Sequence, residues 1–257
     1  MSDLMTNLKS LRDTTGAGFL DCKIALEKNN NEIDKSIEYL RIKGLAKANK
    51  KSSRITNEGI VSVFSNQNKT ILIEVNTETD FVAKNDIFLN FIDKIGEFSL
   101  QISNENLLNN DLFLKQKLEE KALKDHFNDL VAKIGENIIL KRIKLITGGP
   151  NIKIFTYTHN SYRNNIGKIC VALKTEVQSL NDESIELGKN LCMHIAALKP
   201  LSIDIDSLDQ NIISKEKEIH LENIKSSGKP DNIINKILEG KMNKFYSEIT
   251  LLNQNMF

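Results

Sequence analysis

Several residue types are scarce in this sequence of 257 residues, which has no tryptophan, three prolines and three cysteines. Cys22, Cys170 and Cys192 are far apart, no CxxC pair exists, and an odd number of cysteines argues against a disulfide framework. A structural zinc site needs four ligands with paired spacing, which are absent. The cysteine pattern therefore predicts a reduced, cytoplasmic protein.

Long apolar runs are also missing. No run approaches the roughly 20 residues that a membrane-spanning helix needs. Residues 1–13 lack the apolar stretch of a signal peptide. We therefore expect a soluble protein without a membrane partner.

Excess charge of one sign is absent as well, because 35 Lys and Arg stand against 34 Asp and Glu. Only five of the basic residues are arginine, so the planar fork that recognises phosphate and guanine is scarce. This balance disfavours a polycationic binder of nucleic acid. The apolar share of 40% is ordinary for a globular chain and sufficient for a core.

Apolar residues at helical spacing predict three short helices near the N-terminus. They cover residues 4–11, 20–26 and 33–40, and Gly44 is expected to close the third. So small a bundle buries little apolar area, which suits a tethered recognition module.

A basic stretch follows the third predicted helix. It has six cations and no acid between residues 41 and 57, which leaves open a contact to an acidic partner or RNA, or a solvated linker. The charge pattern alone favours the linker. The cations are Arg41, Lys43, Lys47, Lys50, Lys51 and Arg54.

The next region is rich in β-branched residues. Residues 59–64 and 70–75 flank a polar connector and predict a hairpin. A helix with one aromatic face is expected over 88–98, an Asn-rich loop over 103–111, and a strand over 138–146.

Further elements continue this mixture. Residues 118–134 predict one or two helices, 152–157 and 169–173 two strands, and 182–198 a helix that Pro200 stops. Because helices and strands come in runs, the pattern favours an α+β fold over a regular parallel βαβ sheet.

The last third is helical and charged. Two amphipathic segments, 207–224 and 233–245, are joined by the short connector 226–230, which predicts an antiparallel helical hairpin. Ile212 and Ile219, seven residues apart, are expected on the apolar stripe of its first helix.

We expect the chain to divide into four parts. Residues 1–56 form a helical module with the basic linker, and 57–204 an α+β core with two sheet subdomains. Residues 205–249 form a coiled-coil-like hairpin, and 250–257 begin a truncated C-terminal segment.

A search for catalytic motifs fails. There is no GxxxxGK[ST] phosphate loop, no GxGxxG after a strand and no HExxH. His194 lies on a predicted packed helix and suits a core position, whereas His159 stands where a strand meets a loop. The motif search therefore indicates no catalytic residue, no metal and no cofactor.

The segment 76–84 is the most suggestive local feature. Thr79 or Asp80 could cap the following helix, with Phe81 as a staple on its first turn. Alternatively, Asp80 and Phe81 form an exposed acid–aromatic pair that inserts into another protein. The local pattern by itself favours the capping interpretation.

Taken together, five motifs resemble the translation elongation factor Ts (EF-Ts) family. They follow the order of that family and cover nearly the whole chain. The motifs are LRDTTGAG at 11–18 with DCKIAL at 21–26, EVNTETDFVA at 74–83, VAKIGENI at 131–138, MHIAA with KP at 193–200, and SGKP at 227–230.

The resemblance implies a guanine-nucleotide exchange factor for the GTPase EF-Tu. It also implies an N-terminal UBA-like three-helix module, a core of two small antiparallel sheets with helices, and a protruding helical hairpin. It implies no covalent chemistry and no direct contact to nucleic acid, and it leaves open a dimer of heterodimers with EF-Tu.

The resemblance also assigns residues to the contact with EF-Tu. It places the N-terminal module on the GTPase domain, and it makes Asp80 and Phe81 the pair that wedges between GTPase helices. The remaining positions are further contacts. The assigned residues are Phe19, Leu20, Lys23, Thr79, Asp80, Phe81, Val82, Ile134, Gly135 and His159.

The sequence departs from the family pattern in three places. The spacer between Lys84 and Val131 and the loop before Ile166 are longer. The chain stops at Phe257, before the family's last strand and helix, so we expect either a fragment or a shortened protein. Two other functions stay open: an RNA- or ribosome-binding module that uses residues 41–54, and an enzyme with a cryptic site.

Overall fold

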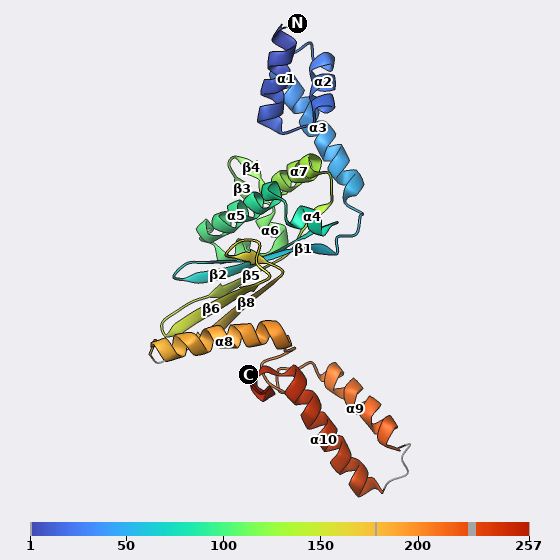
Figure 1. The fold of residues 1–257 in the computed structure, drawn as a ribbon, viewed down its shortest axis with the longest axis vertical. Coiled ribbons are helices and arrows are strands. Elements are labelled where there is room, and N and C mark those ends of the chain that lie inside the picture. The colour runs from blue at the N-terminus through green and yellow to red at the C-terminus, as the bar shows by residue number, and fades with distance from the viewer. Residues whose placement is uncertain (1, 178, 226–229, 257) are drawn as a thin grey trace. The chain divides into compact units, whose positions relative to one another are not determined.

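The computed structural model describes residues 2–177, 179–225 and 230–256 (Figure 1). Helices and small antiparallel sheets come in separate runs, so the predicted α+β class is confirmed. The chain forms two compact units, one of residues 1–150 with 158–172 and the other of 151–157 with 173–257. The four-part division at 56, 204 and 249 stays a prediction.

The first unit begins with the three predicted helices, α1 (Ser2–Thr15), α2 (Phe19–Lys28) and α3 (Ile33–Lys51). The three helices lie together at the N-terminal end of the chain (Figure 1), and their apolar side chains form a small core of their own. The buried members of this core are Leu8, Leu11, Cys22, Ala25, Leu26 and Leu40.

The prediction that Gly44 ends the third helix is wrong, because α3 continues through it to Lys51. Gly44 lies where α3 crosses α7 (Leu123–Ile134), and a Cβ atom on it would come within 3.2 Å of the Cβ of Ala132. Because glycine has no side chain, the two helices can approach closely at this position, where the sequence pattern had predicted the end of the helix.

The interpretation of residues 41–57 as a solvated linker is wrong for residues 41–51, whereas residues 52–57 do join α3 to β1. Most of the stretch is the second half of α3, and all of its cations except Lys50 contact acids or carbonyls within the described residues. The pairs are Arg41 with Asp125 (3.8 Å), Lys43 with Asp21 (2.9 Å), Lys47 with Asp21 (2.7 Å), Lys51 with the Gly135 carbonyl, and Arg54 with Glu78 (3.4 Å).

A four-stranded antiparallel sheet follows in the order β5-β2-β1-β7. Its strands are β1 (Glu58–Ser65), β2 (Lys69–Thr77), β5 (Ile138–Thr147) and β7 (Ile166–Gly167). The predicted hairpin of β1 and β2 is confirmed, with Ile60 opposite Val75. β7 was not predicted, because a strand of two residues has no periodicity to detect.

Helices pack on this sheet and bury its apolar side chains. The aromatic-faced helix is α5 (Asp86–Gln101), which buries Phe88, Ile92 and Ile95 completely. The short α4 (Asp80–Ala83) precedes it and also packs on β1 and β2.

The segment between α5 and β5 differs in part from expectation. The Asn-rich segment contains a 3-10 turn, η1 (Glu105–Leu107), and the start of α6 (Asn110–Phe113). A small hairpin of β3 (Lys117–Leu118) and β4 (Lys121–Ala122) precedes α7, so Leu118 is in a strand and not in a helix.

The second unit contains α8 (Asp182–Leu198) with the predicted bounds. Asn181 and Ser184 form a capping box at its start. Phe155 packs against Gly188 of this helix, where a Cβ atom would lie 2.5 Å from the ring. Phe155 belongs to β6 (Ile152–His159), which pairs with β8 (Ile169–Glu176) in a two-stranded sheet.

The predicted hairpin is formed by α9 (Gln210–Lys225) and α10 (Asp231–Ile249) (Figure 1). Its seam buries Ile224, Ile234, Leu238 and Met242, whereas Ile212 and Ile219 are exposed, so the predicted stripe of the first helix is wrong. The predicted connector and the SGKP motif lie, up to residue 229, outside the described residues.

A 3-10 turn, η2 (Leu251–Asn253), follows α10, and Thr250 pairs with Ser202 in an isolated parallel bridge. Among the helices of the described ranges, none combines the length and apolar character that crossing a membrane requires.

Candidate functional site

Phe81 stands out at the turn that follows β2. Its side chain is 81% exposed, whereas Val82 and Ala83, the next two residues, are buried in the core beneath the turn. Phe81 is therefore not a staple that packs on a helix, and that interpretation is wrong. A buried anchor holds the backbone, and the ring is directed to solvent.

The capping interpretation also fails for the long helix. Thr79 precedes α4 but its side chain makes no capping hydrogen bond, and α4 has only four residues. The cap of α5 is Asn85, whose side-chain oxygen accepts a hydrogen bond from the N–H of Ile87 at 2.9 Å. The side chain of Thr79 is thus available for another contact.

Thr79 makes this contact with Glu136, 57 residues further along the chain. Its N–H donates to Glu136 Oε2 at 3.0 Å, and its hydroxyl donates to Glu136 Oε1 at 2.7 Å. In return, the N–H of Asn137 donates to Glu78 Oε1 at 2.6 Å. The turn before Phe81 and the turn after α7 are therefore joined in both directions.

This junction brings Ile134 and Gly135 to the same part of the first unit as Thr79 to Val82. Gly135 ends α7 in a left-handed conformation with φ of +93°, and its N–H donates to the carbonyl of Val131 at 2.9 Å. Ile134 is half-buried against the core. Two groups of residues that are more than 50 positions apart in the sequence thus form one surface region.

Charged residues flank Phe81 in the sequence. Asp80 and Lys84 form an ion pair of 2.7 Å across α4. The hydrogen bond from Lys84 lowers the pKa of the Asp80 carboxyl, and the charge of Lys168 acts in the same direction. The same pair raises the pKa of Lys84. Asp80 is therefore ionised at neutral pH and lies next to Phe81.

His159 is exposed at the end of β6, in the part of this strand that belongs to the first unit. Its carbonyl accepts a hydrogen bond from the N–H of Lys168 at 3.1 Å. Lys168 in turn pairs with Glu58 at 2.6 Å and reaches Asp80 electrostatically. Lys168 therefore connects the His159 segment with the turn that carries Phe81.

Phe19, Leu20 and Lys23 form a separate surface on α2 of the helical bundle. Phe19 and Leu20 are exposed apolar side chains, and Lys23 pairs only weakly with Glu27 at 3.7 Å. The opposite face of α2 is buried in the bundle core. The structure thus presents two candidate docking surfaces, one on α2 and one around Phe81.

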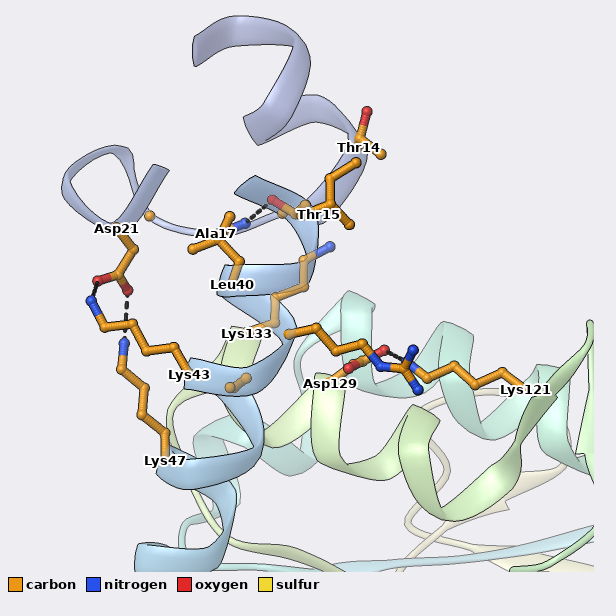
Figure 2. A pocket seen from close by; sticks show the side chains of 16 residues that line it. Thr14, Thr15, Ala17, Asp21, Leu40, Lys43, Lys47, Lys121, Asp129 and Lys133 are labelled. Atoms are coloured by element: carbon orange, nitrogen blue, oxygen red, sulfur yellow. Dashed lines mark hydrogen bonds and ion pairs between the residues drawn. The ribbon is translucent and has the colours of Figure 1, made fainter. Parts of the chain in front are cut away.

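A cavity of about 270 Å³ lies between the loop after α1, helix α3 and helix α7 (Figure 2). Asp21 faces Lys43 and Lys47 at its wall, and Asp129 meets Lys121 (Figure 2). Hydrogen bonds from Lys47 and Lys43 hold the pKa of Asp21 below its usual value of 3.8. Both acids are paired with lysines: the Asp21 pairs join α2 to α3, and the Asp129 pair joins α7 to β4.

The described residues contain no group of three or more His, Cys, Asp or Glu side chains that could hold a metal ion. Burial raises the pKa of the Cys192 thiol to about 11 and that of Cys170 in the same direction, which disfavours the nucleophilic thiolate. His194 is buried, and its Nε2 lies 3.1 Å from Gln254 Oε1, as expected of a core histidine.

Sequence reasoning missed Glu78, Glu136 and Asn137. All three lie inside the quoted motifs, but neither periodicity nor spacing indicates that residues 78–79 and 136–137 touch. Two local signals were available. Residues 78–79 are a polar pair directly after a buried strand, and residues 136–137 are a polar pair directly after a glycine that ends a helix.

Comparisons with known proteins agree with the motif resemblance. The family model described as "Elongation factor TS" matches residues 78–257. Elongation factor Ts of Brucella anthropi is 39% identical over 254 residues, which are 99% of this chain and 82% of the relative. Elongation factor Ts of Gluconobacter oxydans is 37% identical over 248 residues, which are 96% of this chain and 80% of the relative.

Proposed function

Because this chain belongs to the elongation factor Ts family and is thus a factor of translation elongation, we propose that it is a guanine-nucleotide exchange factor for EF-Tu. In this proposal, it binds EF-Tu loaded with GDP and promotes the release of GDP so that GTP can bind. The chain carries out no covalent chemistry and acts as a binding protein.

The observation that carries the proposal is the exposure of Phe81 on a turn with a buried anchor. An aromatic side chain costs free energy in water and gains it when it enters a pocket of a partner. Because Val82 and Ala83 fix the turn in the core, the ring can enter such a pocket without rearrangement of this chain. Asp80 adds a negative charge next to the inserted ring.

The mechanism follows from linkage between two ligands of one protein. If this chain binds nucleotide-free EF-Tu more tightly than the GDP-bound form, it must weaken GDP binding by the same factor. Each tenfold loss of GDP affinity requires about 1.4 kcal/mol of such differential binding. A ring that wedges between GTPase helices would shift the groups that coordinate magnesium. The negative charge of the bound phosphates would then be less well neutralised.

The surface on α2 gives the proposed complex a second contact. Phe19 and Leu20 offer apolar area, and the bundle core supports them from behind. Both surfaces belong to the first unit, so binding of one surface raises the effective concentration of the other at its own site on the partner. In this proposal, the α2 surface contributes affinity, and the turn with Phe81 contributes the exchange step.

The RNA-binding alternative loses its main support. It depended on the cations of residues 41–54, and most of them are engaged by Asp21, Asp125, Glu78 and the Gly135 carbonyl. Few arginines remain free to contact phosphates.

The deciding experiment measures release of fluorescent GDP from EF-Tu with and without this chain. We expect acceleration that rises with concentration of the chain and saturates. If the intact chain does not accelerate release, the exchange proposal is wrong. Tight binding to RNA with a steep salt dependence would then favour the alternative.

A further inference from the structure

The turn that carries Phe81 cannot hold its own shape. Helix α4 is a single turn of four residues, and Thr79 leads into it with an extended backbone and no capping bond. An isolated helical turn is unstable, because nucleation costs more free energy than one hydrogen bond returns. Its orientation must therefore come from contacts with the rest of the first unit.

Glu136 supplies two of the polar contacts, both of them to Thr79. Both of its carboxylate oxygens accept hydrogen bonds from Thr79, one from the N–H at 3.0 Å and one from the hydroxyl at 2.7 Å. Because backbone and side chain of one residue are bound together, Thr79 can neither rotate nor shift along the chain while both bonds persist. Phe81 is only two residues away, so this attachment acts on its backbone from one side while the buried Val82 and Ala83 hold it from the other.

The two residues next to Glu136 in the chain are themselves fixed by hydrogen bonds. Gly135 before it adopts the left-handed conformation that ends α7, and its carbonyl accepts a hydrogen bond from Lys51. Asn137 after it is buried, and its side-chain amide donates to the carbonyl of Arg54 at 2.9 Å. Lys51 of α3, the end of α7 and the carbonyl of Arg54 therefore help to fix the position of Glu136, and none of them belongs to α4.

We propose that Glu136 is a positioning residue that acts through Thr79 to keep the Phe81 ring directed into solvent, ready to enter a partner. The proposal rests on the exchange function proposed above and adds a residue to it. Glu136 need not touch the partner. Its contribution is that the free chain already has the bound conformation of the turn, so that no ordering is required on binding.

A double-mutant cycle tests this role. Glu136→Ala is expected to slow GDP release from EF-Tu by about tenfold, the order that loss of charged hydrogen bonds produces. In a Phe81→Ala background the same change is expected to alter the rate by less than about twofold, because there is no ring left to position. Equal losses in both backgrounds would overturn the proposal.

Two further variants keep this cycle interpretable. Glu136→Gln retains one acceptor oxygen, so the rate of GDP release with this variant is expected to lie between the rates with the wild type and with Glu136→Ala. Glu119→Gln is the control, because it removes a carboxylate that pairs with Lys94 at 2.6 Å. Neither residue belongs to the two docking surfaces. This variant is expected to leave the rate unchanged, and an equal loss in Glu119→Gln would also contradict the proposal.

Amide hydrogen exchange of the full chain gives a readout that does not depend on EF-Tu. The Thr79 N–H is expected to be protected in the wild type and to lose at least about tenfold of its protection in Glu136→Ala, while strand β2 stays protected. Unchanged protection of Thr79 would overturn the positioning role. If the wild-type chain fails to accelerate GDP release but Thr79 loses protection as expected, the exchange function fails and the attachment of the turn stands.

Discussion

Phe81 and Val82 are neighbours in the chain and point in opposite directions from the single turn of α4. The ring of Phe81 is in solvent, and the side chain of Val82 is buried with Ala83 against the sheet and α5. Adjacent residues thus serve binding and folding separately. This separation makes it feasible to remove one role and keep the other.

The first prediction concerns Phe81→Ala. Because the ring makes little contact within the chain, its removal should change the free energy of unfolding by less than about 0.5 kcal/mol. The rate of GDP release from EF-Tu should fall about tenfold or more, as for a central aromatic anchor of an interface. Urea unfolding and a stopped-flow release assay measure the two effects.

Phe88→Ala is the matched comparison for this prediction. Phe88 lies in α5 and is completely buried, so its truncation should cost about 3–5 kcal/mol of unfolding free energy. If Phe81→Ala destabilises the chain as much as Phe88→Ala does, Phe81 belongs to the core and its proposed role is wrong.

The second prediction compares one substitution at two helical glycines. A Cβ atom on Gly96 of α5 would lie 2.0 Å from the Phe64 ring, whereas one on Gly240 of α10 would meet nothing within 4 Å. Gly96→Ala should therefore destabilise by about 1–3 kcal/mol through overpacking. Gly240→Ala should stabilise by about 0.5–1 kcal/mol, because alanine favours helix. Urea unfolding of both variants provides the test, and equal signs would contradict it.

The third prediction concerns acid and the Asp21 carboxyl. Lys47 and Lys43 lower its pKa below 3.8 in the folded chain, so the pairing stabilises fully above that pH and is lost as the pH falls through the folded pKa. The difference in unfolding free energy between wild type and Asp21→Asn should be constant from about pH 7 to 5 and shrink below about pH 4. Urea midpoints across this range measure it, and a constant difference down to about pH 3 would refute it.

The fourth prediction concerns the Cys192 thiol. With a pKa of about 11 in a buried position, its thiolate is rare near pH 8, so iodoacetamide should modify it at least about a hundredfold more slowly than in the unfolded chain. Mass spectrometry of the Cys192 peptide, with and without denaturant, measures both rates. Rapid labelling of the folded chain would show that the second unit opens near this residue.

Elements with long, regular patterns were predictable from the sequence. α8 has the predicted bounds, and α5 buries the expected apolar face. The failures occur where a local signal has two meanings. A glycine such as Gly44 can end a helix, but here it lies where α3 packs against Ala132 of α7. Only the presence of α7 decides between these two roles.

The candidate site divides in the same way. Asp80 and Phe81 could be singled out by family resemblance, although the local pattern favoured a cap and a staple. Glu136 could not be connected to Thr79, because no rule of spacing relates residues 57 positions apart. Likewise, the cations of residues 41–54 have the pattern of an exposed linker, and their acids and carbonyl acceptors come from distant segments.

The sequence by itself determined the family, the α+β class and the order of helices and strands, because these depend on motifs and on periodicities that act within a few residues. Only the tertiary structure decided that Phe81 is exposed and that Glu136 holds the turn before it. Whether a side chain is buried or paired depends on which surfaces meet when the chain folds, and such contacts between distant segments leave no local periodicity in the sequence.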